Sequence, residues 1–546
     1  MMNKFLKGFI KILVILAVVF LEYWFLLPPI NLRSTAFYFF IAVVTVTAFV
    51  IGRIGNLFSA VKTVKEVNVN NVKALSIGTF KGLKLSTKTT VIICLLLAVL
   101  VLVGNIIGAK IFNASKYNTL ITFNDGDFVK EVSEIGMDQI PVVDRDTASR
   151  LGQRKLGEMS DLVSQFEIEE IYTQINYKGR PVRVTPLRYG DIIKWFNNRK
   201  QGIPAYITVD MASQDTALIR LDNGIKYSKS EYFMRNVERK LRFDYPTRIF
   251  DDISFEIDDN GTPYWVASTV EFRIGLFSGR DIGGAVLMNA VTGESKYYAL
   301  SEIPSWVDQV FSSTMVLNQL DYNGKYRSGW LNSIIGQKGV IATTDGYNYL
   351  AINDDVWLYT GITSVTSDES NIGFVLTNLR TKETKYYPLP GAEEYSAMSS
   401  AQGQVQHLGY KATFPILLNV AARPSYFMSL KDSAGLVKMY AFVDVQQYQI
   451  VGTGNTVEES RIDYLNKLKK NDVTLSEEKN ENISGTVSEI GSAVMDGNTC
   501  YFVTLEGNDK VFILPVTLSD RLPFLKTGDV ITVHFNQSEV TKVEFN

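Results

Sequence analysis

Three long apolar runs within the first 112 residues constrain this chain more than any other feature. They lie at 12–27, 36–52 and 89–109, and the rest of the sequence has the composition of a soluble protein. Each run is close to the roughly 20 apolar residues that a membrane-crossing helix needs. We therefore expect a transmembrane anchor with helices at about 9–30, 36–52 and 89–112. The remaining 434 of the 546 residues would form a soluble body.

The distribution of basic residues predicts the orientation of this anchor. Three lysines precede the first run, and segment 53–88 carries seven basic residues against one acid. Positively charged loops stay on the cytoplasmic side of a membrane. The N-terminus and segment 53–88 should thus be cytoplasmic, and three crossings place residues 113–546 outside. The first run ends in Tyr23-Trp24-Phe25, which is typical of an interfacial aromatic belt rather than of a signal-peptide cleavage site.

The charge of the body argues against nucleic-acid binding, and the two cysteines argue against a disulfide in the body. Residues 1–112 hold 12 basic and 2 acidic residues, a net charge of +10, whereas the remainder holds 43 basic and 55 acidic residues, a net charge of −12. Because nucleic-acid binding depends on neutralising phosphates, an acidic body disfavours it. The two cysteines, Cys94 in the third run and Cys500 near the C-terminus, cannot pair. A large exported body without disulfides fits a Gram-positive bacterial protein of the cytoplasmic membrane.

Two polar features within the apolar runs are candidates for a role in the membrane. Glu22 lies beside the aromatic belt, which favours an interfacial position over a buried functional carboxylate. Gly104 and Gly108 form a small-xxx-small face around Asn105, which suits close helix packing. This face would pack within the chain's own helices, and a homo-oligomer formed through the helices remains an alternative.

An internal repeat organises the body. Residues 284–300 and 373–389 share Gly, Val, Leu, Asn, Thr, Glu, Lys, Tyr, Tyr and Leu in register, and 435–448 is a weaker third copy. Each copy predicts a strand, a tight turn and a second strand, and an aromatic strand precedes each one. We also expect a strand at 117–123, helices at 144–166 and around 306–311, and a last helix opening with the capping box Thr456-Val-Glu-Glu459.

One local pattern resembles the PepSY and cystatin-like group. It joins Asp258-Asp259-Asn260-Gly261-Thr262-Pro263-Tyr264-Trp265 to Asn289-Ala290-Val291-Thr292-Gly293-Glu294, similar to that group's DGxPxW…GxVxVNAxTGE pattern. The layout as a whole resembles Gram-positive multi-helix membrane proteins with such modules outside the cytoplasm. The resemblance implies small sheets packed on a helix that bind or restrain peptidases and wall-lytic enzymes.

The expected architecture is thus a membrane-anchored α+β protein. Its parts are an anchor at 1–112, a juxtamembrane α+β domain at 113–245, a PepSY-like module at 246–330, further such modules at 331–470, a linker at 471–481 and an OB-like β-barrel at 482–546. The five strands predicted for the barrel are 483–490, 499–505, 511–516, 530–535 and 540–545.

No catalytic, metal or cofactor signature is found in the sequence. The two histidines, His407 and His534, lie far apart, and the Asp and Glu pairs occupy turn-like segments where Asp is common. We therefore expect no catalytic residue, metal or cofactor. The aromatic side chains offer candidate partner-binding residues instead, namely Tyr264, Trp265, Tyr297, Tyr386 and Tyr426.

The preferred interpretation is a non-enzymatic scaffold that binds an envelope protein such as a peptidase or wall hydrolase. A partner strand would find room at an open sheet edge. Two alternatives remain open. One is an envelope hydrolase or glycan-binding protein with a cleft between modules, and the other is an accessory subunit of a membrane transporter.

Overall fold

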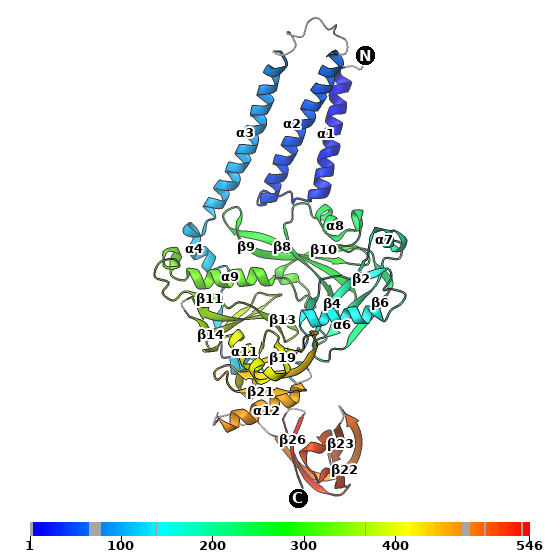
Figure 1. The fold of residues 1–546 in the computed structure, drawn as a ribbon, viewed down its shortest axis with the longest axis vertical. Helices are drawn as coiled ribbons and strands as arrows, with labels where there is room; N and C mark the ends of the chain where they lie inside the picture. The colour runs from blue at the N-terminus through cyan, green and yellow to red at the C-terminus, as the bar shows by residue number, and fades with distance from the viewer. Residues whose placement is uncertain are drawn as a thin grey trace. The chain divides into compact units, whose positions relative to one another are not determined.

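The computed structural model describes residues 4–64, 78–136, 139–365, 367–471, 481–495, 498–536 and 539–545. The chain forms two compact units (Figure 1). The first comprises Met1–Leu418 and Pro424–Leu465, and the second comprises Asn419–Arg423 and Asn466–Asn546. The predicted linker at 471–481 lies almost entirely outside the described residues, as does the middle of the basic segment 53–88.

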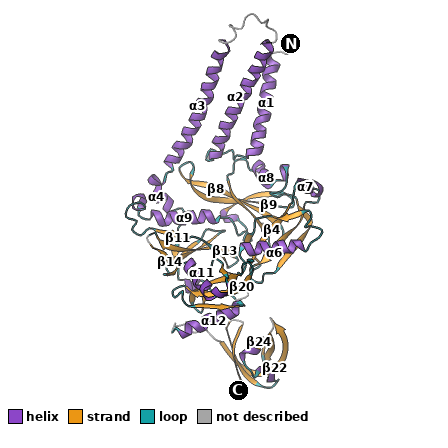
Figure 2. Cartoon of the chain, viewed as in Figure 1, coloured by secondary structure: helices purple, strands orange, loops and turns teal. Residues whose placement is uncertain are grey.

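Three apolar helices open the chain. They are α1 (Lys4–Leu26), α2 (Thr35–Val64) and α3 (Gly78–Ile107), and each contains a window long and apolar enough to cross a membrane. Most of their large apolar side chains are exposed, as expected of surfaces that face lipid. Glu22 of α1 accepts a hydrogen bond from the Thr47 hydroxyl of α2, so this carboxylate joins two helices. The predicted membrane association is supported, and Figure 2 shows the three long helices at one end of a body built mainly of strands.

The residues after α3 continue as a short helix rather than the expected strand. Helix α4 spans Lys110–Asn118, so the strand predicted at 117–123 is wrong. Tyr117 explains the difference, because its ring is buried against Tyr322 at a centroid distance of 5.0 Å and its hydroxyl donates to the Gly108 carbonyl. The chain then forms β1 (Asn124–Asp125) and α5 (Phe128–Glu131).

Four sheets make up the body of the first unit. Sheet I contains β2 (Phe166–Ile168), β3 (Thr173–Tyr177), β4 (Arg180–Tyr189), β5 (Ile203–Asp210) and β6 (Thr216–Ile225). Sheet II contains β7 (Phe250–Ile257), β8 (Pro263–Ile274), β9 (Ser278–Asn289) and β10 (Ser295–Ala299).

Sheet III contains β1 together with β11 (Ile341–Thr343), β12 (Asn348–Ile352), β13 (Asp355–Ser364), β14 (Ser367–Asn378), β15 (Thr384–Tyr387) and β16 (Gly391–Ala392). Sheet IV contains β17 (Lys411–Ala412), β18 (Ile416–Val420), β19 (Arg423–Lys431), β20 (Val437–Asp444) and β21 (Val451–Gly454).

Helices pack around these sheets. They are α6 (Arg145–Gly157), α7 (Ile192–Asn198), α8 (Val237–Asp244), α9 (Ser313–Tyr326), α10 (Gly329–Asn332), α11 (Glu394–Gln404) and α12 (Val457–Lys470). Helix α6 stops at Gly157, well before the predicted end at 166, and Phe166 is instead the first residue of β2. The predicted start of α12 is confirmed, since the Thr456 hydroxyl accepts the Glu459 amide at 3.1 Å, while the Glu459 carboxylate accepts the amide of Asn455 rather than that of Thr456.

The helix predicted around 306–311 is wrong. Val307, Val310 and Phe311 are buried, but the amides of Val310 and Phe311 donate to the carbonyl of Leu379, directly after β14, instead of closing a helical turn. Apolar spacing alone could not distinguish a helix from a non-helical segment that bonds to a neighbouring strand's end, because both bury the same side chains.

The predicted hairpins of the repeat are confirmed, and they share one turn. The Asn289 side chain accepts the amides of Val291 and Thr292, and the Asn378 side chain accepts those of Arg380 and Thr381. The fifth residue of each turn, Gly293 or Lys382, has a positive φ. These contacts are local, which is why the sequence revealed them.

The same turn occurs in sheet I, and sheet IV has a turn that is one residue longer but uses the same side-chain contacts. Asp444 accepts two amides in this way between β20 and β21. Asp210 does so between β5 and β6, where it accepts the amides of Ala212 and Ser213. Sheet I, which we expected to be a distinct juxtamembrane domain, therefore carries the hairpin feature of the repeat without its sequence pattern.

The second unit contains one five-stranded sheet in the order β24-β23-β22-β25-β26. Its strands, β22 (Glu481–Met495), β23 (Asn498–Leu505), β24 (Asn508–Pro515), β25 (Val530–Asn536) and β26 (Glu539–Phe545), match the five predicted ones closely. The long strand β22 pairs with β25 through its first half and with β23 through its second. No pairing joins β24 to β26 in the described residues, so they form an open sheet rather than the closed barrel we expected.

Candidate functional site

A cavity of about 490 Å³ lies where the sheets of the first unit meet. Sheet I supplies Gln174 and Arg183, sheet II supplies Ser254 and Ser268, and β12 of sheet III supplies Asn348 and Tyr349. Tyr347 and Phe414 contribute further aromatic surface. The volume lies within the range of small-molecule and peptide side-chain pockets. We call this space the junction cavity.

Arg183 is the most informative residue of the junction cavity. It lies on β4, is 7% exposed, and donates weak hydrogen bonds to the Tyr172 carbonyl at 3.2 Å and to Gln174 Oε1 at 3.3 Å. Its Nε has no hydrogen-bond partner in the described residues, and the same is true of Gln174 Nε2 beside it. Burial lowers the pKa of the Arg183 guanidinium. A buried cation normally has an acidic partner, so this arrangement requires an explanation.

No acid of the cavity wall forms an ion pair with Arg183 in the described residues, although the charge of Asp144 favours the charged guanidinium. Asp144 caps α6 through the Thr147 amide and forms a 2.5 Å ion pair with Lys431. Although burial opposes the effect, hydrogen bonds from Lys431 and Thr147 hold the pKa of the Asp144 carboxyl below its usual value. Asp252 is the other acid of the wall, whereas Arg145 and Lys229 add positive charge. The cavity is therefore suited to an anionic group.

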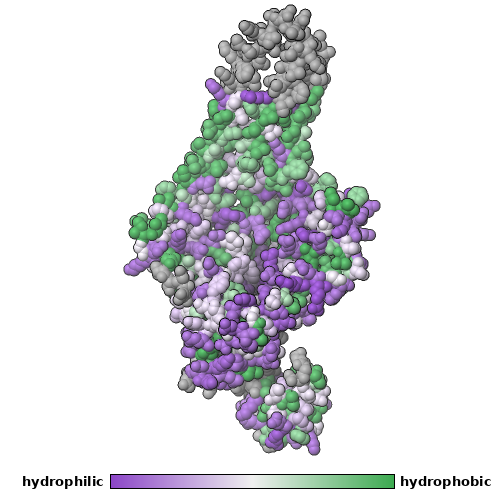
Figure 3. Space-filling model, viewed as in Figure 1, coloured by the Kyte–Doolittle hydropathy of each residue, from purple (hydrophilic) through white to green (hydrophobic). Residues whose placement is uncertain are grey.

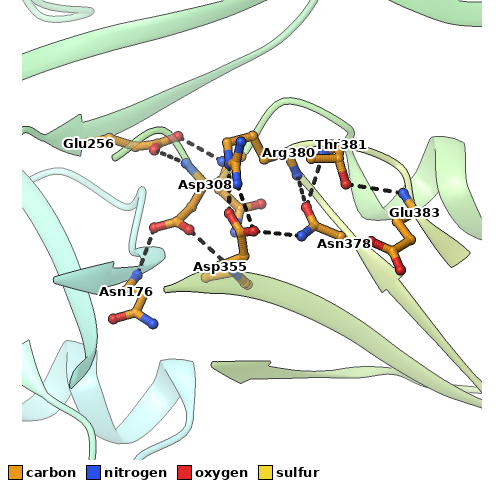
Figure 4. Close-up of polar contacts among 10 residues, drawn as sticks. Asn176, Glu256, Asp308, Asp355, Asn378, Arg380, Thr381 and Glu383 are labelled. Carbon is orange, nitrogen blue, oxygen red and sulfur yellow. Dashed lines mark hydrogen bonds and ion pairs between the residues drawn. The ribbon is translucent and has the colours of Figure 1, made fainter. Parts of the chain in front are cut away.

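A buried carboxylate network lies behind the cavity wall (Figure 4). Glu256 of β7 accepts the Asp308 amide at 2.8 Å and the Gln309 amide at 3.2 Å, and Asp308 accepts the amides of Asn176 and Val356. The network thus ties β3, β7 and β13, which belong to three different sheets. Because all these groups accept backbone donors and none of the acids lines the cavity, they position its walls rather than contact a ligand.

Asp355 and Arg380 extend this network into sheet III. The Arg380 Nε and Nη2 atoms donate to the two Asp355 oxygens at 2.6 and 2.8 Å, and Asn378 Nδ2 donates to Asp355 at 2.8 Å. This bidentate pair joins the start of β13 to the repeat turn that follows β14.

Glu256 should make the stability of the body depend on pH. Burial raises the pKa of its carboxyl to about 7, above the ordinary value of 4.5. Between pH 4.5 and about pH 7 the Glu256 carboxyl keeps its proton in the folded state and loses it in the unfolded state. The free energy of unfolding therefore falls as pH rises through this range. The contribution amounts to about 3 kcal/mol and is fully present only below the unfolded pKa. In Glu256→Gln this part of the pH dependence should disappear, as measured by urea unfolding of the full chain in detergent at pH 5 and pH 8.

The matched control for this prediction is Glu294→Gln, which changes an exposed glutamate of a repeat turn. It should leave the difference between the two pH values as in the unmodified chain. Equal differences for the unmodified chain and Glu256→Gln would show that Glu256 does not titrate in this range.

The structure places the five predicted partner-binding residues outside the junction cavity. Trp265 and Tyr426 are fully buried, the former donating to the Tyr227 carbonyl and the latter to the Ala392 carbonyl. Tyr264 is half-buried against Trp306. Tyr297 and Tyr386 occupy equivalent places in the repeat, where each ring covers a glycine and each hydroxyl donates to a carbonyl 14 residues earlier.

The small-residue face of α3 contacts the body instead of another helix. An added Cβ at Gly104 would clash with the Phe277 ring, and one at Gly108 would clash with the Ser278 side chain. Both contacts come from the tip of the β8–β9 hairpin. Gly104 and Gly108 thus let the hairpin approach the end of the helix.

Sequence reasoning missed Arg183 and the residues around it. The available signal was Arg183 itself, a charged residue between the β-branched residues Val182 and Val184. Such alternation normally indicates a strand with its charged side chain exposed, so the sequence did not suggest that Arg183 is buried. In the described residues no cluster of three or more His, Cys, Asp or Glu side chains is placed to hold a metal ion.

Comparisons with known proteins do not assign this chain to a family. No protein-family model matches the chain, and no curated protein matches it. Among solved structures, an ACO/RPE65 chimera aligns over 69% of this chain and 60% of its own, with 9% sequence identity and a TM-score of 0.13. A TM-score of that size does not indicate a shared fold.

Proposed function

We propose that this chain is a non-catalytic, multi-pass protein of the cytoplasmic membrane whose body, outside the cytoplasm, binds a protein of the cell envelope. The basic residues flanking the apolar helices support this orientation. The proposal keeps the tandem PepSY/cystatin-like reading of the four sheets and the OB-like reading of the C-terminal strands. It draws support from the shared hairpin turn of the sheets and from the strand positions of the second unit.

The observation that carries the proposal is the buried guanidinium of Arg183 in the junction cavity, which forms no ion pair in the described residues. Arg183 has five N–H donors, and two of them are used in the hydrogen bonds described above. The Nε of Arg183 and the Nε2 of Gln174 are buried from solvent, so the free N–H groups on the two terminal Nη atoms are the donors that suit a carboxylate, which can accept two parallel N–H bonds from a guanidinium. The aromatic wall formed by Tyr347, Tyr349 and Phe414 suits an adjoining apolar or peptide surface. The ligand is thus a carboxylate-bearing segment of the partner protein.

The geometry supports binding rather than hydrolysis. A glycoside hydrolase needs two carboxyl groups on opposite sides of its substrate. Of the two acids in the cavity wall, Asp144 is engaged by Lys431 and by the cap of α6, which leaves Asp252 alone. Glu256 and Asp308 are buried behind the wall and already accept backbone amides.

Site-specific photocrosslinking in intact cells tests this function. A benzophenone amino acid at Tyr347, an exposed residue of the cavity rim, should give a crosslinked adduct with a partner protein. Arg183→Gln should weaken binding about thirtyfold or more, because a desolvated charge pair is worth about 2 kcal/mol or more, and the adduct should then be lost. Quantification of the adduct on immunoblots of the full tagged chain gives the measurement.

The control positions the crosslinker at Tyr448, which is similarly exposed but lies outside the cavity. Adducts formed there should not depend on Arg183. Far-UV circular dichroism of the purified variant checks that the fold is kept. A Tyr347 adduct of undiminished yield in folded Arg183→Gln, or no adduct in the unmodified chain, would overturn the proposed function.

A further inference from the structure

Two exposed apolar patches lie on the body close to the ends of the transmembrane helices. The first, which we call the α7 patch, has Ile193 at 69% and Phe233 at 64% exposure. Its members are Ile192, Ile193, Phe196, Tyr232, Phe233 and Met234. The buried Trp195 ring holds them together, at centroid distances of 6.4 Å from Phe196, 4.8 Å from Tyr232 and 6.1 Å from Phe233. Single exposed apolar residues are ordinary, but a contiguous group marks an interaction surface.

Basic residues accompany the α7 patch. The Arg199 guanidinium lies 4.5 Å from the centre of the Phe196 ring, and Arg235 donates to the Arg199 carbonyl. The other basic residues of these segments are Lys194, Lys200 and Arg239, and the exposed acids are Asp191, which pairs with Lys194, and Glu238. An apolar surface bordered by cations matches the boundary between phospholipid headgroups and acyl chains.

The α7 patch is continuous with the anchor through α8. Phe243 of α8 makes edge contacts with the aromatic rings of Phe20, Tyr23 and Trp24 in α1. The Arg239 guanidinium lies 4.5 Å from the centre of the Trp24 ring, and Arg242 donates to the Leu27 carbonyl at 2.9 Å. Trp and Tyr at a helix end mark the membrane–water interface. Figure 1 shows α8 next to the end of α1, with α7 farther out on the same flank of the body.

A second patch, the α10 patch, lies beside the end of α3. It consists of Leu331, Ile334 and Ile335, which are 63%, 54% and 66% exposed. Helix α10 packs against α4, which begins three residues after α3 ends and itself exposes Phe112. Lys325 and Lys338 lie nearby in the sequence and are exposed. Figure 3 shows apolar surface on both flanks of the body as well as on the helices.

We propose that the α7 and α10 patches rest on the lipid surface of the membrane that the helices cross. Their apolar side chains enter the boundary between headgroups and acyl chains, and the basic residues are attracted to the net negative charge of anionic phospholipid headgroups. Two separate patches beside α1 and α3 give the body two contacts with one leaflet. The junction cavity is thereby held in a fixed orientation to the membrane. This contact depends neither on which side of the membrane carries the body nor on what the cavity binds.

Depth-dependent fluorescence quenching of the full chain tests the lipid contact. The chain, with Cys94 and Cys500 replaced by alanine, is labelled with an environment-sensitive fluorophore at Ile193→Cys or Ile335→Cys and reconstituted in liposomes. These contain phosphatidylcholine and phosphatidylglycerol, with or without bromine on the acyl chains. Brominated lipid should quench both labels at least twofold more than a label at Leu408→Cys, an exposed apolar residue away from both patches. Equal quenching at the three positions would overturn the proposal.

A charge variant tests the headgroup part of the proposal separately. Arg199→Gln with Lys200→Gln should reduce the quenching of the label at 193 in liposomes that contain phosphatidylglycerol. In pure phosphatidylcholine the same variant should leave quenching unchanged, because the leaflet then has no net charge to attract the cations. Unchanged quenching in both lipids would refute the role of the basic residues, while the apolar contact would stand on the first test.

Discussion

Replacing Trp265 with alanine is expected to lower the free energy of unfolding by about 3–5 kcal/mol. The indole is completely buried between sheets I and II, packs edge-on to Phe255 at 5.2 Å, and donates its N–H to the Tyr227 carbonyl at 2.7 Å. Its removal would leave both a large cavity and an unpaired carbonyl. Urea unfolding of the full chain in detergent, followed by far-UV circular dichroism, measures the loss.

The neighbouring Tyr264 provides the matched control, because it points to the opposite face of the same strand. It is half-buried with its ring 4.9 Å from Trp306, so Tyr264→Ala should cost about 1–2 kcal/mol. If Trp265→Ala instead left stability within 1 kcal/mol of the unmodified chain, the indole could not be a core residue. Its sequence-based assignment to partner binding would then regain support.

Breaking the Asp355–Arg380 pair is expected to have an effect of similar size. Asp355→Ala should lower the free energy of unfolding by about 3–5 kcal/mol, because it leaves the partly buried guanidinium without its carboxylate. The variant also removes the acceptor for the Asn378 side chain at the repeat turn. The same unfolding assay at pH 7 gives the measurement.

Arg380→Ala and the double variant complete a mutant cycle. The double variant should cost clearly less than the sum of the two single variants, because the second substitution removes a charge that the first left unpaired. Asp161→Ala is the control, since Asp161 and Arg220 form a 2.9 Å ion pair in which both side chains are more than half exposed. This pair should contribute less than about 1 kcal/mol to the free energy of unfolding. Additive losses in the cycle would contradict a coupled pair.

Several parts of the fold followed from local patterns. The hairpins of the repeat were predictable because an Asn or Asp side chain binds amides only two and three residues ahead. The cap of α12 was predictable for the same reason. Where the sequence misled us, as at 117–123 and 306–311, the pattern of apolar residues was right about burial. It could not indicate whether the backbone donors would find partners in a helix or in a neighbouring sheet.

The candidate site was largely beyond prediction because its parts come from distant segments. Gln174, Arg183, Ser254 and Tyr349 meet only when three sheets pack together. The raised pKa of Glu256 and the lack of an ion pair to Arg183 among the described residues depend on the same packing. The aromatic residues chosen from the sequence illustrate the same limit, since alternation along a strand does not show which face becomes the core.

The sequence by itself determined the apolar anchor, the sheet hairpins and the lack of a disulfide, because each depends on composition or on residues a few positions apart. Tertiary structure decided which charged groups are buried, where a cavity remains between the sheets, and which apolar side chains stay exposed beside the helices. These outcomes depend on the free energy of removing a given group from water, and that is set by neighbours that the chain brings together only on folding.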